Sequence, residues 1–192
     1  MQDLIRKAML DGIELRQQCT EPLLKPLADA ADMMVQCLQS GGKILVCGNG
    51  GSAADAQHFV AELVNRFEMN RRALAAISLT NDASVMTSIA NDFEFNAVFS
   101  RQVEALGRAG DVLLAISTSG DSPNVLKAMD EAAGLDMLNI TLTGRDGGKI
   151  GLHDGVSVHI NIPHASTARV QEMHITCLHI LCTLIDERMF GG

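Results

Sequence analysis

Two short loops in this sequence contain the residue types that hold a phosphorylated small molecule. Residues 48–52 are Gly-Asn-Gly-Gly-Ser, and residues 117–122 are Ser-Thr-Ser-Gly-Asp-Ser. Glycines let the backbone approach a ligand closely, and a helix that begins after such a loop presents unpaired N–H groups to an anion. The hydroxyl groups of the second loop add hydrogen-bond donors, so this loop is predicted to bind a phosphate monoester. The pair Asn91-Asp92 has the polar groups that suit sugar hydroxyls, and helix capping is its alternative role.

Each loop also has a simpler explanation, a glycine-rich turn followed by a Ser or Thr helix cap. Two such loops, each between a predicted strand and a predicted helix, favour ligand binding. A P-loop is excluded because the sequence lacks GxxxxGK[S/T]. Residues 48–53 match the loose dinucleotide pattern GxGxx[G/A], but the next strand runs into Thr80 and Asn81 and not into an acid that could bind ribose. Asp121 is expected to point away from the phosphate or to cap a helix.

Two helical segments supply acid, base and metal-ligating groups. His58 and Glu62 are four residues apart, and they therefore share one face of the helix that follows the first loop. Gln171, His174 and His179 lie on one broad face of the last predicted helix, where Gln171 and His179 are about 12 Å apart along the axis. A surface His–Glu pair and hydrogen-bonded core histidines are the structural alternatives.

The chain around these groups alternates short apolar runs with helical stretches. Five runs rich in Val, Ile and Leu are predicted to be strands: Lys43–Cys47, Ala73–Leu79, Asp111–Ser117, Met137–Thr143 and Val156–Ile162. Helices are predicted over residues 52–68, 82–106 (as two helices), 121–134 and 166–189. Continuous apolar runs are typical of strands buried on both faces, so the pattern predicts a doubly wound α/β fold with five parallel strands. Ligands of such sheets bind at the carboxyl ends of the strands.

The first 40 residues have helical periodicity and predict two helices. Pro22 is expected to begin the second helix with Thr20 as its N-cap, and Gly41-Gly42 to end it. A length of 192 residues fits one domain. Residues 1–192 are therefore predicted to form a single domain, in which residues 1–40 are a helical segment that packs on the sheet or on a neighbouring subunit.

Composition argues against several classes of protein. Fifteen basic and 23 acidic residues give a net charge of −8, which opposes binding to nucleic acid. No run reaches 18 apolar residues and the first residues lack the apolar core of a signal peptide, so neither a membrane span nor export is expected. Five cysteines without a CxxC pair indicate reduced thiols in a cytoplasmic protein. Trp and Tyr are absent, so a ligand is expected to be held by hydrogen bonds and charge.

Together these motifs resemble those of the bacterial phosphoheptose isomerases, a group within the sugar isomerase (SIS) family. The likeness covers almost the whole chain and rests on Cys47–Ala53, Gln57–Phe59, Glu62-Leu63, Ala90–Asp92, Gly110–Leu114, Ile116–Gly120 and Arg169–His174. The Ser/Thr loop alone is shared by all SIS domains. Its combination with the CGNGGS loop, the His58/Glu62 pair and the Gln171/His179 pair is specific to this family.

The resemblance implies a three-layer α/β/α sandwich with the flavodoxin-like SIS sheet. It also implies an aldose–ketose isomerase that converts sedoheptulose 7-phosphate into D-glycero-D-manno-heptose 7-phosphate through an enediol, in heptose supply for lipopolysaccharide. Glu62 would be the base and His179 the partner acid. Substrate contacts would come from Asn49, Gly50, Gly51, Glu62, Asn91, Asp92, Ser117, Thr118, Ser119, Ser122 and Gln171. One zinc ion per subunit would be bound by His58, Glu62, Gln171 and His179, in a homotetramer with sites between subunits.

Two other functions stay open at this point. A non-catalytic SIS protein that binds the replication initiator or senses a sugar phosphate would need the phosphate loop alone. Initiator-binding relatives lack the acid that corresponds to Glu62, and this chain has it. A nucleotide-binding enzyme would use the GxGxxA loop. A glutamate that ligates zinc is also less free to act as a base, and the residues alone leave that conflict open.

Overall fold

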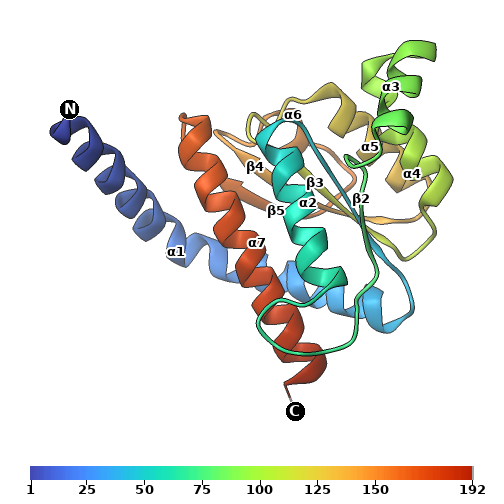
Figure 1. Cartoon of the computed structure of the whole chain (residues 1–192), viewed down its shortest axis with the longest axis horizontal. Helices are drawn as coiled ribbons and strands as arrows, with labels where there is room; N and C mark the ends of the chain where they lie inside the picture. Colours follow the sequence, from blue (N-terminus) through green and yellow to red (C-terminus); the bar gives the residue numbers. More distant parts are fainter. Residues whose placement is uncertain (192) are drawn as a thin grey trace.

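Five parallel strands form the centre of the molecule, in a computed structural model that describes residues 1–191 (Figure 1). The strands are β1 (Ile44–Gly48), β2 (Ala76–Ser78), β3 (Val112–Ser117), β4 (Leu138–Gly144) and β5 (Val156–Ile162), and their order in the sheet is β2-β1-β3-β4-β5. Every neighbouring pair is parallel. The predicted five-stranded α/β sheet is therefore confirmed, although the edge strand β2 is shorter than predicted.

Helices cover both faces of this sheet. They are α1 (Gln2–Gln39), α2 (Gly51–Val64), α3 (Ala83–Asp92), α4 (Ser100–Leu106), α5 (Pro123–Gly134), α6 (Gly148–Gly151) and α7 (Thr167–Phe190), with a 3₁₀ turn at Phe95–Ala97. One apolar core joins α1, α2 and α7 to the sheet, and the other joins α3, α4 and α5. Successive residues of β1 enter opposite cores, Ile44 the first and Leu45 the second, as expected for strands buried on both faces.

The first helix differs from the prediction, because α1 is one continuous helix that includes Pro22 and Pro26. The Thr20 hydroxyl donates to the carbonyl of Arg16 one turn earlier, so Thr20 lies inside the helix and caps nothing. A proline removes one helical N–H donor and favours a break. Here Leu15, Cys19, Leu23 and Leu27 form a single buried stripe across the proline positions, and this packing keeps the helix continuous.

Smaller differences occur at other helix ends. Helix α2 ends at Val64, four residues before the predicted end, and the short helix α6 was not predicted. The predicted segment 82–106 does contain two α-helices, α3 and α4. Within the described residues no helix combines the length and the apolar character that a membrane span requires.

Candidate active site

The two predicted ligand loops lie side by side because β1 and β3 are neighbours at the centre of the sheet. The strand order changes direction at this pair, and ligands of doubly wound folds bind at such a switch point. Two hydrogen bonds of 2.8 Å join the first loop to the start of α5, which follows the second loop: Asn49 Nδ2 donates to Asn124 Oδ1, and Asn124 Nδ2 donates to Asn49 Oδ1. Asn124 is only 2% exposed. The sugar contact that the resemblance implies for Asn49 stays a prediction, and in the structure its carboxamide ties the first loop to the start of α5.

The first loop uses glycine where a side chain would not fit. Gly50 has a φ of +57° immediately before α2, in the left-handed region that favours glycine. A Cβ atom at Gly51 would collide with the carboxamide of Gln171, which reaches over from α7. The close approach that the glycines were predicted to allow is therefore used here by Gln171.

The second loop gathers its hydroxyl groups in front of helix α5. Ser117 Oγ lies 2.9 Å from Ser122 Oγ and 3.4 Å from Ser119 Oγ. Ser122 is the N-cap residue of α5, yet its hydroxyl makes no capping hydrogen bond. Asp121 points elsewhere, as expected, since its Oδ1 accepts a hydrogen bond from the N–H of Lys149 in α6. The hydroxyls and the positive end of the α5 dipole can thus serve one anion.

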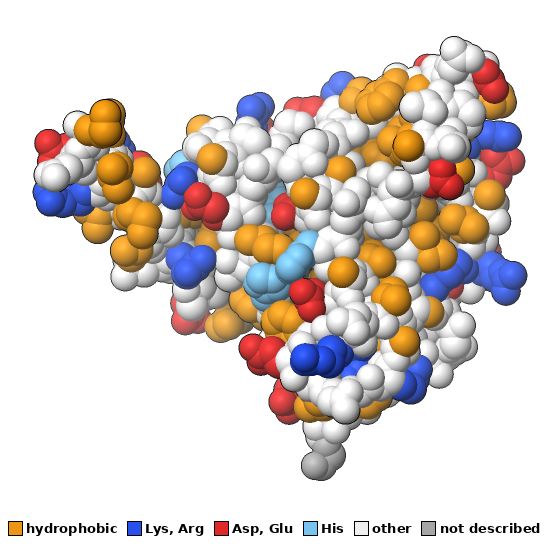
Figure 2. Space-filling model, viewed as in Figure 1, with side chains coloured by type: hydrophobic (Ala, Val, Ile, Leu, Met, Phe, Trp, Pro, Cys, Tyr) orange, Lys and Arg blue, Asp and Glu red, His pale blue; other side chains and the backbone are white. Residues whose placement is uncertain are grey.

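The acid and base groups gather between α2 and α7, which pack against each other (Figure 1). His58 Nε2 lies 3.0 Å from His179 Nε2 and 3.4 Å from Glu62 Oε1. The ring of Phe67 stacks on that of His179, with the centroids 5.6 Å apart. Figure 2 shows histidine side chains at the surface where α2 and α7 meet. The structure therefore brings together three of the predicted groups, His58, Glu62 and His179, in a position open to solvent.

The fourth predicted metal ligand, Gln171, lies against Gly51 near the start of α2. Among residues 1–191, no group of three or more His, Cys, Asp or Glu side chains has an arrangement that could hold a metal ion. Zinc ligands about 2.0–2.2 Å from the ion stand about 3.3 Å from one another in a tetrahedron. The His58–His179 and His58–Glu62 separations are each close to that spacing, so these two pairs match zinc in donor type and spacing, while the described side chains do not form a complete site as they stand.

Asn91 and Asp92 lie apart from this cluster. They are exposed at the end of α3, which packs on the opposite face of the sheet from α2 and α7, and Asn91 Nδ2 donates to Asp92 Oδ1. Within one chain, the structure does not join these two residues to the histidine cluster.

Two further titratable residues lie near the site: His174, for which the sequence left a core role open, and Asp55, which the sequence did not single out. His174 is fully buried and bonds through Nε2 to the carbonyl of Thr143, and its burial lowers its pKa to about 4. It is therefore a hydrogen-bonded core histidine. Asp55 lies one turn before His58 on α2, and burial raises its pKa to about 6, although the nearby His58 acts in the opposite direction. Its i, i+3 spacing from His58 was the signal that could have identified it.

The chain is similar to known proteins in both sequence and fold. Residues 11–144 match the model of the SIS domain. The chain is 50% identical over 192 residues to a phosphoheptose isomerase of Methylibium petroleiphilum, covering 100% of this chain and 96% of the relative. It is 55% identical over 188 residues to that of Aromatoleum aromaticum, covering 97% and 95%. The solved phosphoheptose isomerase of Neisseria gonorrhoeae superposes with a TM-score of 0.92 at 50% identity, covering 97% of this chain and 98% of that one.

Proposed function

The chain belongs to the SIS family and, within it, to the phosphoheptose isomerases, and we propose that it converts sedoheptulose 7-phosphate into D-glycero-D-manno-heptose 7-phosphate. It is accordingly an aldose–ketose isomerase. The observation that carries the proposal is the full-length identity of half or more to relatives of that name. The presence of Glu62 beside His58 and His179 supports catalysis over a binding-only role.

The proposed reaction moves a proton between two neighbouring carbons through an enediol. It requires a base at the carbon beside the carbonyl and an acid at the oxygens. In our proposal the Glu62 carboxylate takes the carbon-bound proton and His179 supplies a proton to oxygen. A hydrogen bond between two Nε2 atoms needs one protonated and one unprotonated nitrogen. The His58–His179 contact of 3.0 Å therefore keeps one N–H proton beside the carboxylate.

The phosphate group has a separate role, which is to hold the substrate in place. We assign its binding to the hydroxyls of Ser117, Thr118, Ser119 and Ser122 and to the start of α5. Anchoring the phosphate orients the carbonyl end and replaces a random encounter with Glu62 by a fixed one, an effect that can supply several kcal/mol of rate acceleration. The clustering of three of these hydroxyls before α5 supports this assignment.

The function is tested by incubating the purified protein with sedoheptulose 7-phosphate and following the product by NMR. We expect signals of a heptose 7-phosphate aldose at equilibrium with the ketose. Sedoheptulose without phosphate is the matched control and should react far more slowly. A protein that leaves the phosphorylated ketose unchanged contradicts the proposal.

Ser119→Ala tests the phosphate loop. We expect KM for the phosphorylated ketose to rise about tenfold or more, because a hydrogen bond to a charged group contributes about 1.5–3 kcal/mol. Steady-state kinetics measure the change, with Ser40→Ala at the exposed end of α1 as the control. An unchanged KM in the Ser117→Ala/Ser119→Ala double variant would contradict the proposal that this loop binds the phosphate.

We also propose that each subunit binds one zinc ion through His58, Glu62, Gln171 and His179. Two imidazoles and two oxygen donors are ligands that zinc accepts, and the distances from His58 to Glu62 and to His179 support the set. Bound there, zinc would supply Lewis-acid polarisation of a substrate oxygen. A carboxylate oxygen or imidazole nitrogen that held zinc could not also carry a proton, so the base role of Glu62 and the acid role of His179 would belong to the site without the ion.

Metal analysis of the purified protein tests the zinc proposal. We expect about one zinc per chain, and we expect the His58→Ala/His179→Ala variant to lose it because two of four donors are gone. His153→Ala is the control, since His153 pairs with Asp130 and lies outside the donor set. Wild-type protein that is metal-free and fully active would contradict the zinc proposal and leave the acid and base roles intact.

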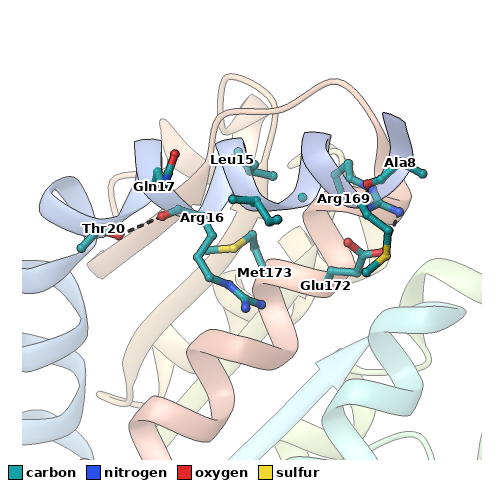
Figure 3. A pocket seen from close by; sticks show the side chains of 11 residues that line it. Ala8, Leu15, Arg16, Gln17, Thr20, Arg169, Glu172 and Met173 are labelled. Atoms are coloured by element: carbon teal, nitrogen blue, oxygen red, sulfur yellow. Dashed lines mark hydrogen bonds and ion pairs between the residues drawn. The ribbon is translucent and has the colours of Figure 1, made fainter. Parts of the chain in front are cut away.

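We further propose a cytoplasmic homotetramer that supplies heptose for lipopolysaccharide. All five cysteines are free and buried, as suits a reducing compartment. The first turns of α1 project from the sheet and expose Leu4, Ile5 and Met9. A hollow of about 420 Å³ lies between this part of α1 and the start of α7 (Figure 3), lined by Ala8, Leu15, Arg16, Gln17, Thr20, Arg169, Glu172, Met173 and three further α1 residues. Burying this surface in a neighbouring subunit would remove it from water.

A further inference from the structure

The end of α2 is held by a side chain from outside the helix. The last carbonyl groups of a helix lack partners within it. At the end of α2, Arg71 is the hydrogen-bond donor to these carbonyl groups. Its Nη2 donates to the carbonyl of Glu62 at 2.8 Å. Its Nη1 donates to the carbonyls of Leu63 at 2.8 Å and Asn65 at 3.3 Å. The last turn of α2 contains no basic residue of its own, so Arg71 also provides the positive charge that suits a helix C-terminus.

The same guanidinium reaches α7. Arg71 Nε donates to Asp186 Oδ1 at 2.9 Å, and the two side chains are only 2% and 6% exposed. Asp186 follows His179 by seven residues, about two helical turns, and therefore lies on the same side of α7. One buried side chain thus links the end of α2, where Glu62 lies, to the helix that carries His179.

The connection between Val64 and Arg71 extends this link. It contains Phe67, whose ring stacks on the His179 ring at a centroid distance of 5.6 Å and an interplanar angle of 25°. Because Arg71 closes this connection by bonding back to Leu63 and Asn65, it also restrains the segment that carries Phe67.

We infer that Arg71 is a positioning residue for the isomerisation: its bonds to the Glu62 carbonyl and to Asp186 set the distance between the Glu62 carboxylate and the His179 imidazole. This inference rests on the proposed function. Arg71 touches none of the side-chain groups of the cluster and acts through the backbone of α2, through α7 and through the Phe67 segment.

A second ion pair, between half-buried Lys43 and buried Asp111, provides a comparison. Lys43 Nζ binds Asp111 Oδ2, and both residues directly precede strands, β1 and β3, at the amino edge of the sheet. The Asp111 carboxylate also accepts hydrogen bonds from the backbone N–H groups of Lys43 and Arg108, so this pair ties together the segments that precede β1 and β3 and not the helices α2 and α7. Breaking either pair is expected to lower stability, because the remaining charge stays buried and unpaired. Only the Arg71 pair is expected to change the chemistry.

The first experiment compares Arg71→Lys with Lys43→Met. Lysine keeps the positive charge facing Asp186. Its single ammonium group cannot replace the planar set of guanidinium N–H donors that reaches the carbonyls of Glu62 and Leu63. We expect kcat of Arg71→Lys to fall about 10- to 100-fold, because small displacements of reacting groups lower the rate by about that factor. KM should stay within about twofold, because the phosphate loop joins β3 to α5 and Arg71 is bonded to α2 and α7. Lys43→Met should keep the wild-type kcat and KM below its melting temperature.

A second variant separates positioning from stability. Replacing a buried ion pair by apolar residues often restores stability, so Arg71→Met/Asp186→Leu should recover much of the melting temperature and remain slow. Recovery of kcat together with the melting temperature, or a kcat for Arg71→Lys within twofold of wild type, would overturn the inference.

Amide hydrogen exchange over residues 62–74 gives a result that does not depend on activity. Exchange there should be faster in Arg71→Lys than in both wild type and Lys43→Met, and equal rates in all three would overturn the inference. Failure of the wild-type protein to isomerise sedoheptulose 7-phosphate would instead contradict the proposed function, so the two failures are distinguishable.

Discussion

Glu62→Gln is expected to lower kcat by about 100- to 10,000-fold, the range that general acid–base groups typically contribute. Glutamine keeps the size and hydrogen-bonding capacity of glutamate but cannot accept a proton at neutral pH. The structure places the Glu62 carboxylate 3.4 Å from His58, beside the proton that His58 and His179 share. KM should change little, because the phosphate loop is intact.

Steady-state kinetics with sedoheptulose 7-phosphate measure this loss. Glu104→Gln is the matched control, since Glu104 is exposed on α4 on the opposite face of the sheet and pairs with Arg101. A Glu62→Gln variant with wild-type kcat would mean that another residue is the base. Asp55, which lies on α2 with a pKa raised to about 6 by burial, would then be the next residue to test.

His179→Gln is expected to lower kcat by a similar factor of about 100- to 10,000-fold. Glutamine retains a polar group near the position of the imidazole but cannot deliver a proton to the substrate oxygen. If Glu62 and His179 act as a unit, the double variant should lose less than the product of the two single losses. His153→Gln is the control, because His153 pairs with Asp130 away from the cluster.

Kinetics of the two single variants and the double variant measure this coupling. Losses that simply multiply would indicate that the two residues act independently. A wild-type rate in His179→Gln would remove His179 from the mechanism and point to His58, whose Nε2 is 3.0 Å from that of His179, as the group that carries the proton.

The sequence predicted the strands and the loops well because both depend on local patterns. Val112–Ser117 is a buried apolar run, and residues 117–122 follow it directly, so the position of the Ser/Thr loop needed no tertiary information. The hydrogen-bonded pair of Asn49 and Asn124 could not be predicted in this way. These residues are 75 positions apart, and they meet only because β1 and β3 are neighbours in the sheet.

The errors have the same origin. Pro22 favours a helix boundary locally. The helix nevertheless continues through it, because a buried stripe packs on both sides of the proline, formed by Leu15, Cys19, Leu23 and Leu27. The prediction that α2 extends to residue 68 did not include Arg71. The guanidinium of Arg71 donates hydrogen bonds to the carbonyls at the actual end of the helix. Packing and long-range hydrogen bonds thus decided the features that local propensity did not.

Solvent deuterium incorporation tests the central claim, that Glu62 removes the carbon-bound proton, most directly. The wild-type protein and Glu62→Gln are each incubated with sedoheptulose 7-phosphate in D₂O, and the substrate and product are analysed by NMR. Enediol chemistry at Glu62 predicts deuterium at the carbon next to the carbonyl with the wild-type protein and almost none with Glu62→Gln. Incorporation at the wild-type rate in Glu62→Gln would contradict the account.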